Sequence, residues 1–109
     1  MSKLLSALQV EAYARDGYVS PIDVLSADEV KTFRQDLEDW EKQRGQTIDF
    51  PEKSKSYLLF NWADQLVHHP RILDAVEDVI GSDILVYHST LFLKEANTPA
   101  YVRWHQDST

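Results

Sequence analysis

Two residues near the end of this 109-residue sequence could bind one metal ion: His105 and Asp107, separated by Gln106. Residues two apart in a β-strand project from the same face, about 6.6 Å apart at roughly 3.3 Å per residue. An imidazole and a carboxylate could therefore converge on one ion, and a second histidine from elsewhere would complete a two-histidine, one-carboxylate Fe(II) site. The alternative interpretation is a partly buried histidine paired with a nearby acid.

The other histidines are weaker candidates. His68 and His69 directly precede Pro70 at an expected helix start, where neighbouring side chains point in different directions, so we expect surface or capping roles. His88 shares one strand face with Thr90 and could line a pocket. The alternative is that it packs in the core or behind the residues that line the pocket.

The composition describes a folded chain, residues 1–109, with room for one domain at most, so it is a small unit or a piece of a larger one. With 43% hydrophobic and 27% charged residues the chain is not a disordered tail, and without cysteine a metal must be held by imidazole and carboxylate groups. The net charge of -7 argues against a nucleic-acid partner. No apolar run approaches the roughly 20 residues that span a bilayer, so we expect no membrane partner and a cytoplasmic location.

Three helices are expected. The first follows Ser6 and ends before Gly17, and the third begins at Pro70 and is closed by Gly81. The second begins at Ser26, which forms a capping-box pattern with a glutamate three residues later, and runs for roughly four turns. Its apolar stripe consists of Val30, Phe33, Leu37 and Trp40.

The remaining segments are expected to be loops and strands. Residues 43–55 are polar and suit a long loop, and residues 57–62 could be extended. Residues 84–93 and 101–107 are rich in β-branched and aromatic residues, which favours strands. Alternation places on one strand face Ile84, Val86, His88, Thr90, Phe92 and Lys94.

Five segments in register resemble the phytanoyl-CoA dioxygenase family of Fe(II)/2-oxoglutarate oxygenases. They are YARDGYV (13–19), VLSADEV (24–30), PRILDAVEDVIG (70–81), TLFLK (90–94) and WHQDST (104–109). The order and spacing of these segments agree with the family as well as their residue types. Together they extend the resemblance over nearly the whole chain.

The resemblance implies a fold, cofactors and site residues. The fold class would be α+β, with N-terminal helices and the first strands of a truncated double-stranded β-helix, a jelly-roll or cupin-like architecture. His105 and Asp107 would be the first two iron ligands, Thr90 would contact the co-substrate 2-oxoglutarate, and Tyr57 matches another co-substrate position. The distal histidine ligand and the arginine that pairs with 2-oxoglutarate would lie beyond residue 109.

The expected function is that of a dioxygenase that uses Fe(II), O2 and 2-oxoglutarate to hydroxylate a small organic substrate. An intact Asp107 favours hydroxylation, because related halogenases have a small residue at that position. The fragment alone should be inactive. The alternatives are a non-catalytic interaction module with a vestigial metal motif and a cupin-like metalloenzyme with another co-substrate. Neither the substrate nor the oligomeric state follows from these residues.

Overall fold

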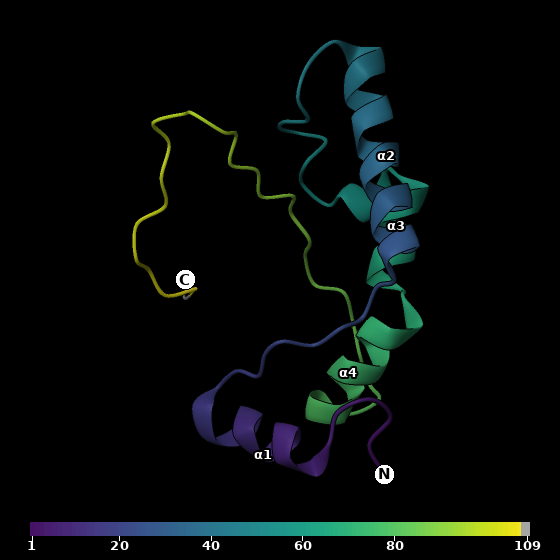
Figure 1. Ribbon diagram of the computed structural model, residues 1–109, viewed down its shortest axis with the longest axis vertical. Coiled ribbons are helices and arrows are strands. Elements are labelled where there is room, and N and C mark those ends of the chain that lie inside the picture. The colour runs from purple at the N-terminus through teal and green to yellow at the C-terminus, as the bar shows by residue number, and fades with distance from the viewer. Residues whose placement is uncertain (108–109) are drawn as a thin grey trace.

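The computed structural model describes residues 1–107, in which a group of helices is followed by a long extended segment (Figure 1). Ser108 and Thr109, which end the family-like segment 104–109, lie outside the described residues. Along residues 1–107 the elements are α1 (Ala7–Asp16), α2 (Ala27–Arg44), the 3-10 helix η1 (Ser56–Leu58), α3 (Asn61–Val67) and α4 (Pro70–Ile80). None of the helices in this part of the chain combines the length and apolar character needed to cross a bilayer.

Capping boxes begin both α1 and α2. At α2, as predicted, Glu29 N–H donates to Ser26 Oγ at 3.2 Å, and Ser26 N–H donates to Glu29 Oε2 at 2.7 Å. Ser6 and Gln9 make the same reciprocal pair at α1. Helix α1 ends before Gly17, also as predicted, because the left-handed backbone there (φ 82°) suits glycine.

Helix α2 is longer than the sequence predicted. Its 18 residues make about five turns rather than four, and it ends at Arg44, after which Gly45 has φ 70°. An ion pair at helical spacing, between Arg34 and Glu38, lies on its exposed side. The predicted loop therefore begins after α2, at residue 46.

Helix α4 matches its prediction, with Pro70 as first residue and Gly81 after its last turn. It also holds the start of the chain. The Asp78 carboxylate accepts three backbone N–H bonds, of 2.7, 2.8 and 2.7 Å, from Lys3, Leu4 and Leu5. Desolvation of the carboxyl group works against its ionisation, but these three donors outweigh it and lower the pKa of Asp78.

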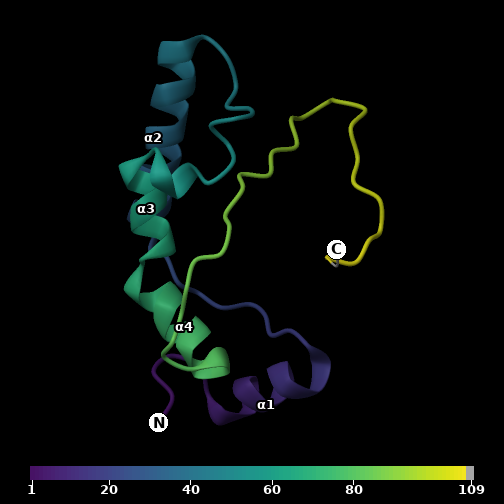
Figure 2. The ribbon, with the colours of Figure 1, turned by 180° about the vertical axis from the view of Figure 1, so that it is seen from behind.

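The chain, including the extended segment, measures 47 × 31 × 25 Å along its principal axes, and its core is small. Helix α2 lies beside α3, α4 continues from α3, and α1 lies beside α4 at the other end (Figures 1 and 2). The buried apolar residues among those described are Leu5, Ile48, Ala63 and Ala75.

Three half-buried aromatic rings connect α2 to the start of α3. The Trp40 and Phe60 ring centroids are 5.4 Å apart with an interplanar angle of 78°, and those of Phe60 and Trp62 are 5.5 Å apart at 20°. Both arrangements are favourable for aromatic pairs. We call these three residues the aromatic cluster.

The two predicted strands are not formed within residues 1–107. Residues 84–93 and 101–107 carry only one antiparallel bridge, between Ser54 and Thr90. A strand needs a ladder of hydrogen bonds to a neighbouring strand, and the described residues supply such a neighbour only over residues 53–55. The β-helix part of the expected α+β fold therefore remains a prediction. Several large apolar side chains of these segments are exposed, namely Leu85, Tyr87, Phe92 and Trp104.

The expectation that residues 57–62 are extended was wrong. They contain the last two residues of η1 and the first two residues of α3. The apolar, aromatic character that suggested a strand instead serves packing, because Phe60 and Trp62 belong to the aromatic cluster and Ala63 is buried.

Candidate metal centre

The side chains of His105 and Asp107 meet although no strand forms around them. His105 Nε2 lies 3.0 Å from Asp107 Oδ1. Both side chains are open to solvent, with exposed fractions of 58% and 96%. The two-residue spacing thus brings an imidazole nitrogen and a carboxylate oxygen to one point that a solute ion can reach.

A backbone carbonyl fixes the orientation of the His105 ring. His105 Nδ1 lies 2.8 Å from the carbonyl oxygen of Arg103, which can only accept, so Nδ1 carries the hydrogen. In the charged ring Nε2–H donates to Asp107 Oδ1, and loss of that hydrogen leaves on Nε2 the lone pair that a metal-binding imidazole requires. The Arg103 carbonyl and the negative charge of Asp107 both favour the charged imidazolium and raise the pKa of His105.

The separation of the two donor atoms suits a first-row metal ion. Ligands at about 2.1 Å from an ion and at right angles to each other are about 3.0 Å apart, the same separation as in the ion pair that these two atoms form here. The donor set, one imidazole and one carboxylate, is also that of two members of the non-haem iron triad. Fe(II) therefore fits these two residues as neighbouring ligands.

A third ligand is not present in the part of the chain that the structure describes. Among residues 1–107, no group of three or more histidine, aspartate or glutamate side chains is placed to hold an ion. Residues 101–107 form the far end of the extended segment, and this end lies apart from the helices in both views (Figures 1 and 2).

Thr90, the residue expected to contact 2-oxoglutarate, lies at the one β-bridge found among residues 1–107. It pairs with Ser54, and its side-chain Oγ1 lies 2.6 Å from His88 Nε2. The two residues that alternation placed on one face are thus brought together. Within residues 1–107, no hydrogen bond or ion pair connects them to His105 or Asp107.

Tyr57 lines a groove that Thr90 does not border. It belongs to η1 and lines an open groove of about 510 Å³, together with Leu73 of α4 and residues 84–86. Neither Thr90 nor His105 borders this groove. Its expected role as a co-substrate contact receives no support from this arrangement.

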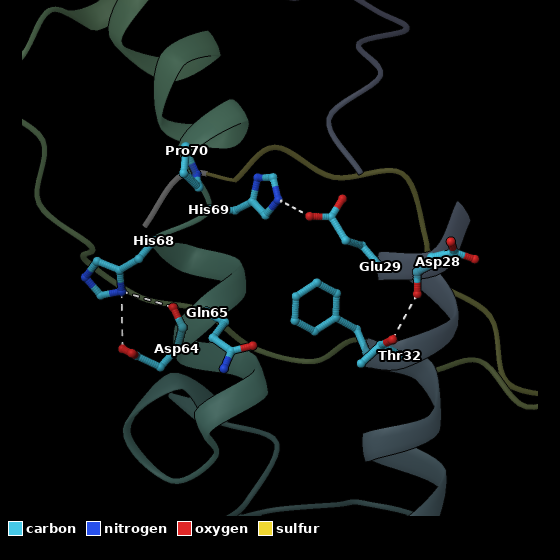
Figure 3. A pocket seen from close by; sticks show the side chains of 9 residues that line it. Asp28, Glu29, Thr32, Asp64, Gln65, His68, His69 and Pro70 are labelled. Carbon is cyan, nitrogen blue, oxygen red and sulfur yellow. Dashed lines mark hydrogen bonds and ion pairs between the residues drawn. The ribbon is translucent and has the colours of Figure 1, made fainter. Parts of the chain in front are cut away.

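His68 and His69 take the surface and capping roles that the sequence predicted. They border an open groove of about 620 Å³ between α2 and the junction of α3 with α4 (Figure 3). His69 Nδ1 accepts the Arg71 N–H at 3.3 Å and so caps α4, whereas His68 pairs with Asp64 at 3.2 Å. Figure 3 shows the two rings turned away from each other, each toward a different carboxylate.

The sequence did not reveal the partner of His69. Because His69 Nδ1 accepts a backbone hydrogen, Nε2 carries the ring hydrogen and donates it to Glu29 Oε1 at 2.9 Å. His69, followed by the N–H and hydroxyl of Ser26, lowers the pKa of Glu29 to about 2. The two residues are 40 positions apart, so no local pattern could have paired them.

Comparisons with known proteins extend over nearly the same residues as the resemblance. The profile of the phytanoyl-CoA dioxygenase (PhyH) family matches residues 13–109. The chain is 26% identical to an ectoine dioxygenase of Bordetella bronchiseptica, over 94% of this chain and 37% of the relative. It is also 26% identical to an L-proline trans-4-hydroxylase of Streptomyces griseoviridis, over 87% and 38%.

An ectoine dioxygenase of Stutzerimonas stutzeri is 28% identical, over 94% of this chain and 38% of the relative. The chain thus spans less than two-fifths of the length of the curated relatives that it matches. No solved structure gave a significant match. Because the family profile covers residues 13–109, which include the segments around Thr90 and the His105–Asp107 pair, the chain belongs to the phytanoyl-CoA dioxygenase family.

Proposed function

We propose that this chain is the N-terminal part of an Fe(II)- and 2-oxoglutarate-dependent dioxygenase domain that hydroxylates a small organic substrate. The observation that carries the proposal is the His105–Asp107 pair, two iron-type donors 3.0 Å apart within a segment that matches the family. In this proposal residues 1–109 are an incomplete part of one oxygenase domain, completed by β-helix strands, a distal histidine and an arginine.

The residues of this chain have two tasks in the proposed site. The Arg103 carbonyl holds the His105 ring so that Nε2 offers its lone pair, and Asp107 supplies the adjoining negative charge. When bound, Fe(II) would activate O2 while 2-oxoglutarate loses CO2, so that a C–H bond of the substrate is hydroxylated. Thr90 would bind 2-oxoglutarate through its hydroxyl group.

The substrate is proposed to be a small molecule. One relative is named as a dioxygenase of ectoine and another as a hydroxylase of L-proline, and both compounds are small molecules. Asp107 would occupy the iron position that a halide takes in related halogenases, which favours hydroxylation. The fatty-acyl substrate in the family name is not part of the proposal.

The isolated chain is proposed to be inactive, because two donors from residues 1–107 would bind Fe(II) weakly and leave the third position of the triad unfilled. The test compares the 109-residue chain with a protein that carries it in a complete oxygenase domain. We expect Fe(II)-dependent release of CO2 from 2-oxoglutarate only from the complete domain, and loss of that release with Asp107→Ala. Turnover by the 109-residue chain would contradict the proposed inactivity.

Absence of both iron binding and 2-oxoglutarate consumption in the complete domain would favour the non-catalytic module. Iron binding and substrate oxidation without 2-oxoglutarate would favour a cupin-like enzyme with another co-substrate.

A further inference from the structure

His88 and Thr90 share a short hydrogen bond on an exposed part of the chain. The distance from His88 Nε2 to Thr90 Oγ1 is 2.6 Å, and both residues are exposed. In water-accessible positions such a bond adds little to stability, because water can satisfy both groups. Its effect is to hold one hydroxyl group in one orientation.

The backbone around Thr90 is already fixed by the loop before η1. Lys55 N–H donates to the Ser89 carbonyl at 2.8 Å, and Leu91 N–H donates to the Lys53 carbonyl at 2.9 Å. Lys55 reaches this position with a left-handed backbone (φ 52°), which is uncommon for a lysine. These bonds fix the backbone on both sides of Thr90. The Thr90 side chain can still rotate, and its hydrogen bond with His88 restricts that rotation.

The chemistry of a carboxylate ligand sets the direction of each hydrogen bond. An ionised carboxylate can only accept, so the Thr90 hydroxyl must donate its hydrogen to it. Thr90 Oγ1 can then only accept from His88, which requires the hydrogen on His88 Nε2. The His88–Thr90–carboxylate series would be charge-assisted and mutually strengthening.

We propose that His88 is a positioning residue for 2-oxoglutarate binding, since its Nε2–H donates to Thr90 Oγ1 and directs the Thr90 hydroxyl hydrogen toward a 2-oxoglutarate carboxylate. This inference rests on the proposed function and adds a residue to it. His88 does not itself contact the ligand in this arrangement.

The test measures the dissociation constant of 2-oxoglutarate by calorimetry, in the complete domain loaded with Mn(II) so that no turnover occurs. Thr90→Val should weaken binding by roughly 10-fold to 100-fold, as expected for a hydrogen bond to a charged group. His88→Phe should weaken it by roughly 3-fold to 10-fold, and His88→Gln, whose amide can donate, should restore most of the loss. Tyr87→Phe is the matched control, because Tyr87 is exposed and adjacent but lies outside the hydrogen-bonded pair.

The double variant distinguishes positioning from general damage. If His88 acts only through Thr90, adding His88→Phe to Thr90→Val should produce no further loss of affinity. Nitrogen-15 NMR of His88 should show the hydrogen on Nε2 when 2-oxoglutarate is bound. Additive losses in the double variant, or a wild-type affinity in His88→Phe, would overturn the inference while leaving the proposed function intact. Failure of the unaltered, metal-loaded domain to bind 2-oxoglutarate would overturn both.

Discussion

Replacing Phe60 by leucine would measure what the aromatic cluster contributes to stability. Phe60 is half-buried and is the member that touches both of the others, with centroid distances of 5.4 Å to Trp40 and 5.5 Å to Trp62. Leucine keeps an apolar side chain but removes both ring pairs. Each pair contributes about 0.5–1.5 kcal/mol beyond burial, so we expect a loss of about 1–3 kcal/mol. In a domain of this size that lowers Tm by on the order of 10 °C.

The assay is thermal and urea unfolding of the chain, followed by far-UV circular dichroism. Phe50→Leu is the matched control, because Phe50 is 75% exposed and is in neither ring pair. If Phe60→Leu lowers Tm no more than Phe50→Leu does, the rings contribute no specific stability and the reasoning is refuted. A Trp40→Leu, Phe60→Leu double-mutant cycle should show a coupling of about 0.5–1.5 kcal/mol.

Three further predictions concern charged groups. The pKa of Glu29 is about 2 in the folded chain and 4.5 in the reference state, so its stabilising effect is fully present above about pH 4.5 and disappears as the pH falls toward 2. Glu29→Gln should therefore lower the urea midpoint at pH 6 and have little effect near pH 2; an equal effect at both would count against the His69–Glu29 bond. Asp78→Ala should speed hydrogen exchange at the amides of Lys3, Leu4 and Leu5, with Asp74→Ala as control, and unchanged exchange would contradict the role of the Asp78 carboxylate. In the complete domain, His105→Ala should weaken Fe(II) binding by more than roughly 100-fold, the loss expected when a residue that only hydrogen-bonds a metal ligand is removed. His68→Ala should leave Fe(II) binding unchanged. Equal Fe(II) affinities of the two variants would show that His105 is not a metal ligand.

The sequence by itself determined the features that depend on residues a few positions apart. The start of α2 could be predicted because Ser26 and Glu29 satisfy each other's backbone groups within one helical turn. The ends of α1 and α4 could be predicted because Gly17 and Gly81 adopt positive φ values that other residues rarely take. The meeting of His105 and Asp107 is local in the same sense, since two-residue spacing in extended chain brings neighbouring side chains to one face.

Only the tertiary structure decided which distant residues meet. The bond of His69 to Glu29 and the bridge of Thr90 to Ser54 depend on how separate segments pack, and neither partner carries a sequence signal for the other. The strands were the weakest sequence prediction for the same reason. Alternating apolar residues make a strand possible, but a strand exists only where another segment completes its hydrogen bonds, and residues 1–107 complete them only beside Thr90.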